Sequence, residues 1–305
     1  MRRFTHGSNV TRVIDIPDGL IARHERYGGP AGRAFVASLP GRAERFLDHW
    51  GLRPDGPSMY GRCALVLPVL RTADGARAVL KLQDVDEETA GEPVALRAWG
   101  GDGAVRLLDS DDETGTLLLE RLDAGRRLAD LPDAREATLV VARLLARLTA
   151  AEPPAGLRHL GDIAKGLAER AAAALPRHPD PAERRLLADC AAALAEVTGE
   201  PGDRLLHWDL HFENVLASGR APWLAIDPKP LVGDPGFDLF PVLWNRFDAG
   251  EVRWRFDALT DVLGLDRARA RAWTLGRVLQ NAVWTVEAGG RPGEEQLEIA
   301  RRLLG

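Results

Sequence analysis

Three polar residues between positions 205 and 238 have the types and spacing that phosphoryl transfer requires. Asp209 and Asn214 lie five residues apart in a stretch that reads as a loop, and Asp227 directly follows the short apolar run 223–226. Transfer from a nucleotide needs a group that positions the acceptor hydroxyl, together with Mg²⁺ to offset the phosphate charge. We expect Asp209 to be the base and Asn214 and Asp227 to be the oxygen ligands of Mg²⁺. The set therefore predicts a small-molecule kinase that uses a nucleotide.

Four further polar residues surround this set. His207 and His211 are four residues apart, as in a zinc pair on a helix, but no third ligand is placed nearby and the segment reads as a loop. His211 is therefore predicted to pack in the loop or to face the substrate. Asp234 and Asp238 could bind substrate as well, but we favour capping of the following helix and support of the loop, because an aspartate accepts hydrogen bonds from free N–H groups there.

A hairpin upstream must carry the phosphate-binding lysine. Two apolar strands, 63–70 and 78–82, flank the turn signal Asp74-Gly75, and Lys81 lies inside the second strand. A lysine in an apolar strand is costly without a partner, and Glu92 in the predicted helix 86–99 is the candidate that could pair with it. Two alternatives stay open: Lys81 reaches the surface while Glu92 is solvated, or Glu88 is the partner.

The strand-rich part of the sequence ends near residue 122. A second hairpin is predicted from strands 104–108 and 116–122, and helical periodicity dominates afterwards. In a two-lobed kinase the connector recognises adenine through its backbone, so Glu120 and Leu122 are proposed from their position alone. Gly61 is the single glycine in the turn expected to cover the phosphates. Residues 1–122 are predicted to form a nucleotide-binding lobe and 123–305 a helical lobe.

Helical patterns fill the rest of the chain, which makes the expected fold class α+β. The first lobe begins with a helical prelude at 18–50, interrupted at 28–30 and at Leu39-Pro40-Gly41. The helices expected in the second lobe are 133–150, 160–175, 181–197, 236–247, 251–263, 267–288 and 293–304.

Composition excludes several other classes of protein. A net charge of −5 with no run of Lys or Arg gives no reason to expect nucleic acid, and no apolar run is long enough to span a membrane. The two cysteines, Cys63 and Cys190, form neither a metal nor a redox spacing. We expect a cytoplasmic enzyme acting on a small molecule. Its oligomeric state is left open, and a monomer is compatible with the sequence.

Several segments resemble the aminoglycoside phosphotransferases, a family with a bilobal protein-kinase-like fold. Residues 207–214 have the form HxDxxxxN, and Asp227-Pro228 stands where protein kinases have Asp-Phe-Gly. The resemblance covers nearly the whole chain and is closest to the streptomycin 6-kinases and related aminoglycoside/hydroxyurea resistance kinases. Other segments that carry the resemblance are 96–103, 118–123, 225–235 and 274–281.

The resemblance implies a role for each residue at a matching position. Asp209 would orient the antibiotic hydroxyl and accept its proton, while Asn214 and Asp227 would hold Mg²⁺ on the phosphates of ATP. Lys81 would contact the α- and β-phosphates with Glu92 supporting it. His207 would fix the catalytic loop through hydrogen bonds. No GxGxxG phosphate loop is present, so the phosphate contacts near Gly61 would be made by few backbone groups.

Substrate residues are sought on the helix 271–287. One stripe is apolar, and a second combines aromatic, amide and acidic side chains, from which Trp284, Glu287 and neighbouring Asn281 are the candidates. A guanidinium-bearing acceptor needs acids to pair with and flat surfaces to stack on. The alternative is a core tryptophan beside a solvated glutamate. The leading expectation is phosphorylation of streptomycin or a close relative. The alternatives are a kinase for hydroxyurea or another metabolite, and an inactive kinase-like binding module.

Overall fold

Apolar strands near the start of the chain pair into an antiparallel sheet. The structure, a computed structural model, describes residues 14–305, so the first 13 positions of the predicted first lobe lie outside the described residues. Strands β3 (Leu65–Arg71) and β4 (Arg77–Leu82) pair across a turn in which Gly75 has a φ of 70°. Glycine adopts this left-handed backbone without steric cost. The hairpin predicted at Asp74-Gly75 is therefore confirmed.

The complete sheet has six strands in the order β1-β3-β4-β6-β5, with β2 paired to β3. Strand β4 lies in the middle of the sheet, between β3 and β6. Lys81 on β4 is therefore opposite Val66 of β3 on one side and Leu117 of β6 on the other. The second predicted hairpin starts later than expected, because Ala104 forms a bridge with Ala225 instead of extending the sheet. The other strands are β1 (Leu52–Pro54), β2 (Met59–Tyr60), β5 (Leu107–Asp111) and β6 (Thr116–Glu120).

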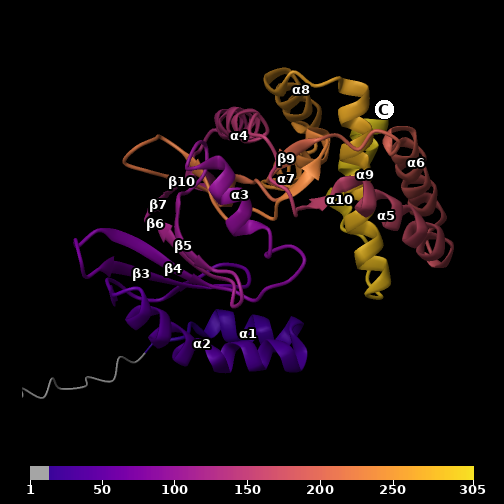
Figure 1. The fold of residues 1–305 in the computed structure, drawn as a ribbon. Helices are drawn as coiled ribbons and strands as arrows, with labels where there is room; N and C mark the ends of the chain where they lie inside the picture. The colour runs from indigo at the N-terminus through magenta and orange to yellow at the C-terminus, as the bar shows by residue number, and fades with distance from the viewer. Residues whose placement is uncertain (1–13) are drawn as a thin grey trace, which may run out of the picture. The chain divides into compact units, whose positions relative to one another are not determined.

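Two helices cover one face of this sheet, α1 (Asp18–Tyr27) and α2 (Gly29–His49) (Figure 1). The apolar stripe of α2 packs on the inward side chains of β3, β4 and β6, which gives the unit one continuous core. The break predicted at residues 28–30 is confirmed, since α2 begins at Gly29 with Pro30 in its first turn, where a missing N–H is tolerated.

The second predicted break, at Leu39-Pro40-Gly41, is wrong. Helix α2 continues through Pro40 to His49, although an internal proline removes one hydrogen bond and crowds the preceding turn. Leu39 and Ala43 are fully buried on either side of it. Burial of this stripe against the sheet therefore outweighs a local preference that the sequence displays clearly.

Two glycines of α2 provide a matched test of this packing. A methyl group on Gly41 would meet no atom within 4 Å, whereas one on Gly32 would lie 2.7 Å from the His24 carbonyl oxygen. We expect Gly41→Ala to raise the free energy of unfolding by about 0.5–1 kcal/mol, because alanine loses less backbone entropy in a helix. Gly32→Ala should lower it. Urea denaturation of both variants checks the pair, and equal effects would contradict the packing.

By internal contacts the chain divides into two compact units. The first contains the chain up to Val85 and Leu108–Arg121, and the second contains Asp86–Leu107 and Leu122–Gly305. Helix α3 (Glu92–Trp99) thus groups with the second unit. The functional division into lobes at residue 122 stays a prediction.

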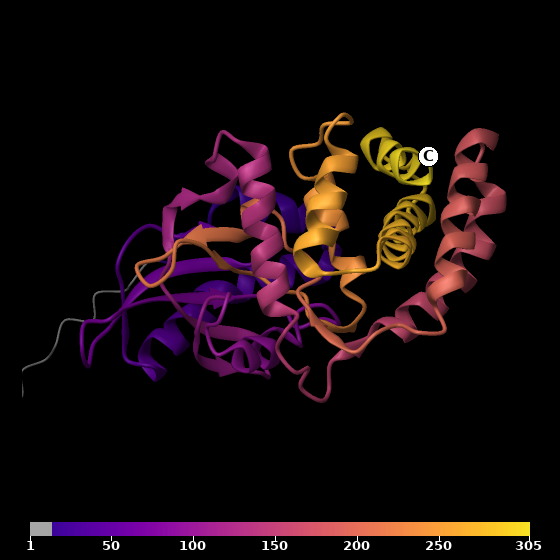
Figure 2. The same ribbon diagram turned by 90° about the horizontal axis from the view of Figure 1, so that it is seen from above.

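The second unit is mainly helical, as expected. Helix α9 is its centre and packs against α5, α6 and α10 (Figures 1 and 2). In the described part of the chain, no helix combines the length and apolar character needed to cross a membrane. The helices of this unit besides α3 are α4 (Ala134–Leu148), α5 (Leu160–Ala174), α6 (Pro181–Val197), α7 (Phe240–Trp244), α8 (Val252–Leu263), α9 (Arg267–Glu287) and α10 (Glu294–Leu304), with 3₁₀ turns η1 (Leu128–Asp130), η2 (Leu175–Arg177), η3 (Phe212–Asn214) and η4 (Pro235–Asp238).

Two small sheets in this unit hold the segment 205–238. One has the order β11-β10-β7 and the other β8-β12-β9. Strand β7 was not expected, because helical periodicity was predicted after residue 122, yet its exposed residues pair with β10. This strand forms because it pairs with a strand that is distant in the sequence. The periodicity of its own residues cannot reveal such pairing. The strands are β7 (Asp123–Arg127), β8 (Arg158–His159), β9 (Arg204–Leu206), β10 (Val215–Ala217), β11 (Leu224–Ala225) and β12 (Leu231–Gly233).

Candidate active site

The loop between β9 and β10 carries Asp209 and is held at both ends by side chains. Asp238, in the 3₁₀ turn η4, accepts hydrogen bonds from the backbone N–H of His207 (2.9 Å) and of Trp208 (2.6 Å). Asn214 closes the other end, because its side-chain amide donates to the Asp209 carbonyl at 2.8 Å. The Asp209 side chain itself remains 32% exposed. The loop thus presents one accessible carboxylate from a fixed backbone.

His207 links this loop to the strand that ends before Asp227. Its Nδ1 accepts a hydrogen bond from the Asp209 N–H (3.3 Å), and its Nε2 lies 3.1 Å from the Ile226 carbonyl. Both contacts are satisfied by the neutral ring with its proton on Nε2. Complete burial lowers the pKa of His207 to about 3, a shift that the charge of Asp227 opposes. A neutral, buried imidazole suits a structural role in holding the loop better than a role in proton transfer.

Asp238 is fully buried, and this burial raises the pKa of its carboxyl group to about 7. The two N–H donors of the loop and the nearby charge of Arg277 oppose the shift. Asp234 also caps η4, accepting from the Gly236 N–H at 2.8 Å and from Arg269 Nε at 2.6 Å. Both aspartates thus contact the elements that they were predicted to support.

Asp227 follows β11 in a left-handed conformation, with a φ of 57°. Such a backbone costs a non-glycine residue about 1–2 kcal/mol and is common at functional sites. Lys229 lies beside it, its Nζ 3.0 Å from an Asp227 carboxylate oxygen. Burial opposes the charge of Lys229, but Asp227, Glu92 and Asp209 together raise its pKa above the usual value. Sequence reasoning missed this lysine, because a loop residue between two prolines has no periodic pattern.

The donor set suits magnesium better than a metal that needs an all-protein cage. Among residues 14–305, no group of three or more His, Cys, Asp or Glu side chains gathers as a metal site. Mg²⁺ is commonly held by one or two protein oxygens, with phosphates and waters completing its octahedron. Asn214 uses its amide nitrogen on Asp209, which leaves its oxygen available, and the Asp227 carboxylate already holds one cationic group.

The predicted nucleotide residues outside this loop occupy several elements. Lys81 is buried in β4, and Gly61 lies in the turn between β2 and β3, its N–H bonded to the Ala64 carbonyl at 3.0 Å. Glu92 begins α3 and is fully buried. Glu120 ends β6, and Leu122 follows shortly after it, both of them partly exposed. The pairing of Lys81 with Glu92 and the adenine contacts stay predictions.

The predicted substrate residues have unequal surroundings. His211 Nε2 lies 4.0 Å from an Asp209 carboxylate oxygen. Trp284 is 37% exposed on α9, and Asn281 is partly exposed one turn before it. Glu287 forms an ion pair with Arg170 of α5, which lowers the pKa of Glu287. A substrate cation would have to displace that arginine, so Glu287 is the weakest of these candidates.

Two guanidinium groups and two indole rings form an alternating column next to Asp209. The centres of the Arg158 and Arg277 guanidinium groups each lie 4.4 Å from the centroid of the Trp208 ring, and Arg277 is also 5.9 Å from that of Trp284. Trp208 has a left-handed φ of 67° and is 2% exposed. Burial lowers the pKa of Arg277 to about 10, whereas the charges of Asp209 and Asp238 oppose the shift. No sequence pattern predicted this column, because its residues come from separate elements.

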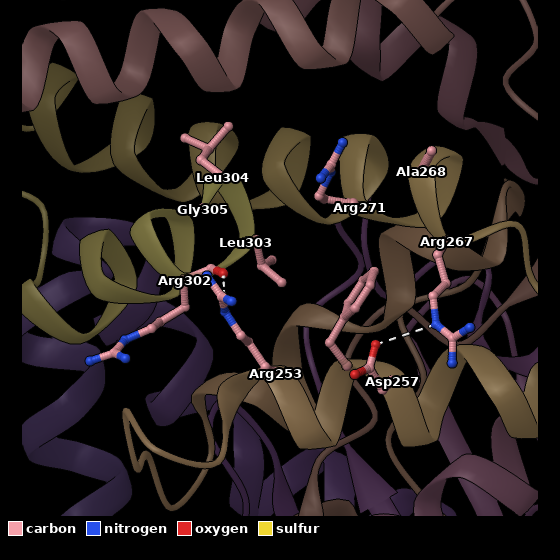
Figure 3. Close-up of a pocket in the computed structure, with 10 residues that line it drawn as sticks. Arg253, Asp257, Arg267, Ala268, Arg271, Arg302, Leu303, Leu304 and Gly305 are labelled. Atoms are coloured by element: carbon pink, nitrogen blue, oxygen red, sulfur yellow. Dashed lines mark hydrogen bonds and ion pairs between the residues drawn. The ribbon is translucent and has the colours of Figure 1, made fainter.

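A pocket elsewhere in the second unit contains none of the predicted site residues. It has a volume of about 470 Å³ and is bordered by arginines on α8, α9 and α10 (Figure 3). Arg253 Nε donates to the Arg302 carbonyl at 3.0 Å, and Arg267 lies 3.3 Å from an Asp257 carboxylate oxygen (Figure 3). Arg253 and Arg267 are therefore engaged with the protein itself, and we assign the pocket no chemistry.

A kinase-like fold with a clamped aspartate loop and a second aspartate after a short strand defines a small-molecule phosphotransferase. The chain belongs to the aminoglycoside/hydroxyurea antibiotic resistance kinase family, whose model matches residues 49–289. It is therefore a phosphotransferase that acts on a hydroxyl acceptor. The predicted fold class and family are both confirmed.

Individual proteins show the same relationship. The chain is 64% identical to a hydroxyurea phosphotransferase of Kitasatospora aureofaciens over 300 residues, covering 97% of this chain and 88% of the relative. It is 55% identical to the streptomycin 6-kinase of Streptomyces glaucescens over 289 residues, covering 92% and 94%. In fold it matches aminoglycoside phosphotransferase APH(4)-Ia in a complex with AMP-PNP and hygromycin B. That match has a TM-score of 0.59 at 17% identity and covers 85% of this chain and 95% of the other.

Proposed function

We propose that this protein transfers the γ-phosphoryl group of Mg²⁺-bound ATP to the hydroxyl of hydroxyurea. The observation that carries the reaction type is the clamped loop, which holds the Asp209 carboxylate exposed while Asp238 and Asn214 bond its backbone. The substrate is supported by the greater identity to a hydroxyurea phosphotransferase, 64% against 55% for a streptomycin 6-kinase. The streptomycin reading that the sequence favoured thereby becomes the second candidate.

In the proposed mechanism Asp209 hydrogen-bonds the acceptor hydroxyl and takes its proton as the oxygen attacks phosphorus. Its partly exposed side chain, on a backbone fixed by hydrogen bonds, suits this role. Asn214 and Asp227 supply oxygens for Mg²⁺, which, when bound, offsets charge on the phosphates. Lys81, buried in β4, is the proposed contact of the α- and β-phosphates, with Glu92 as its support.

Charge near Asp209 bears on the choice of acceptor. Arg277 is 7% exposed and close enough to Asp209 for their charges to interact. A polycationic antibiotic would meet like charge at this point, whereas neutral hydroxyurea would not. The charge of Arg277 and the ranking by identity therefore both support hydroxyurea.

One observation favours streptomycin. Asp86, Glu87 and the partly exposed Glu88 form an acidic stretch before α3, and their charges act on the partly buried Arg158. Clustered acidic side chains attract cationic ligands. A guanidinium-bearing acceptor therefore stays a second candidate.

Steady-state kinetics with both acceptors distinguish these candidates. Purified protein with Mg²⁺ and ATP is given hydroxyurea or streptomycin, ADP release is followed, and the phosphorylated product is identified by mass spectrometry. We expect a higher kcat/KM for hydroxyurea and a product heavier by one phosphoryl group. A higher kcat/KM for streptomycin would reverse the choice of substrate, and absence of turnover with either acceptor would contradict the proposal.

A further inference from the structure

Lys229 is a cationic residue that lies against a carboxylate of the proposed site. Its ammonium group lies 3.0 Å from an oxygen of Asp227, and its side chain is only 16% exposed. Asp209 and Glu92 are close enough for their charges to favour the ammonium form as well. The charges of three carboxylates thus act on one lysine, while the neighbouring His207 is neutral. Without that ammonium the carboxylates would repel one another.

The backbone of Lys229 is fixed more firmly than its side chain. Its N–H donates to the His207 carbonyl at 3.0 Å, and Pro228 and Pro230 restrict the chain on either side. The start of α3 is docked here, because a methyl group on Gly91 would come within 3.0 Å of a Pro230 side-chain atom. This contact brings Glu92, the first residue of α3, to the same place. Only the flexible end of the lysine is left to change partners.

We propose that Lys229 is a further catalytic residue, which pairs with Asp227 in the free enzyme and moves to the transferring phosphoryl group when Mg²⁺ and ATP bind. The inference rests on the proposed phosphoryl transfer. The Asp227 carboxylate cannot pair fully with the lysine and bind the metal at the same time, so metal binding at Asp227 releases the ammonium group. A lysine released next to Asp209 can also contact the negative charge that develops on the transferring phosphoryl group, and one such electrostatic contact contributes substantially to rate.

The chemical step balances without a proton from Lys229. The acceptor oxygen forms a bond to the γ-phosphorus, the bond from that phosphorus to its bridging oxygen breaks, and the electron pair leaves with ADP. The acceptor proton passes to Asp209. Lys229 supplies charge alone and remains protonated throughout, as its carboxylate surroundings favour.

The test measures metal binding without nucleotide, and kinetics separately. Mn²⁺ is titrated into wild type, Lys229→Met, Lys229→Arg and the control Lys165→Met, which removes an exposed lysine of α5. Free Mn²⁺ is read by electron paramagnetic resonance. We expect Lys229→Met to bind Mn²⁺ about tenfold more tightly than wild type, because the ammonium group that competes with the metal for Asp227 is gone. Lys229→Arg and Lys165→Met should resemble wild type.

In the kinetic measurement Lys229→Met should lose about 10²-fold or more in kcat, with the KM of the acceptor little changed. Lys229→Arg should restore part of that loss. Lys229→Gln, which keeps a polar end group, replaces the methionine variant if circular dichroism shows the latter unfolded. Unchanged Mn²⁺ affinity, or a loss of kcat that arginine does not reduce, would overturn the proposal. Should wild type phosphorylate no acceptor, the proposed function fails while the Mn²⁺ titration still decides the pairing with Asp227.

Discussion

Asp209→Asn is expected to lower kcat by about 10²–10⁴-fold, because the amide keeps the shape of the carboxylate but cannot accept the hydroxyl proton. The substitution should leave folding intact. The loop is held through its backbone by Asp238 and Asn214, and the Asp209 side chain makes no part of that clamp. The thermal midpoint should therefore stay close to that of wild type. ADP release at saturating acceptor, together with a melting curve, measures both quantities.

The matched control is Asp203→Asn, a change at an aspartate whose side chain is 95% exposed just before β9. It alters net charge equally, so its kcat should equal that of wild type. A retained kcat in Asp209→Asn would remove this residue from the role of base. An equal loss in both variants would point to net charge in place of a specific proton acceptor.

Asp238→Ala is expected to disorder the catalytic loop and to lower both stability and activity. It leaves the N–H groups of His207 and Trp208 without their acceptor in a buried place, which costs about 1–3 kcal/mol for each group. It also removes a buried carboxyl group that acts on the charge of Arg277. We expect kcat to fall by about 10²-fold as Asp209 loses its fixed position. Urea denaturation and ADP release measure the two losses.

The carboxyl group of Asp238 also makes stability depend on pH. Its pKa is raised from 3.8 in the unfolded chain to about 7 by burial, so the folded protein keeps a proton that the unfolded chain has released. Stability from this group is fully present below the unfolded pKa and is lost as pH rises through about 7. Between about pH 5 and pH 8 wild type should lose about 3 kcal/mol relative to Asp238→Asn, which cannot titrate.

The comparison of wild type with Asp238→Asn isolates this group, because the other titrating residues are common to both proteins. Asp189→Asn, at an exposed position on α6, serves as the control and should show the pH dependence of wild type. A difference between wild type and Asp238→Asn that does not vary with pH would show that Asp238 titrates normally. The clamp would then rest on an ordinary ionised carboxylate.

Periodicity predicted several elements of this fold in which one face is buried, but the helix expected at 236–247 was wrong, because this segment forms the 3₁₀ turn η4 and the short helix α7. The expected helix 181–197 matches α6, and the expected helix 267–288 differs from α9 by one residue. Pro40 misled the prediction, since burial of the α2 stripe overrides its local effect. The exposed strand β7 has no apolar alternation, so its pairing with β10 could not be read from its own residues.

The residues of the candidate site likewise fall into two groups: those that the sequence predicted and those that only the folded chain reveals. The loop and the strand-end aspartate follow from residue type and spacing within one stretch of sequence. Lys229 could have been noticed as a cation two residues after Asp227, but only the folded chain shows the carboxylate beside it. Arg158, Trp208 and Arg277 come from three separate segments, and their stacking depends on tertiary structure alone. The acceptor contacts depend on a ligand and stay predictions.

The column of rings and guanidinium groups has an optical consequence. Indole emission responds to nearby charge, and Trp208 lies between two cations directly beside the proposed base. Trp284 lies 5.9 Å from one of those cations and is exposed to solvent. Events at Asp209 should therefore change the local electric field at Trp208, its neighbour in the chain. The protein therefore carries a built-in fluorescent probe of its catalytic loop.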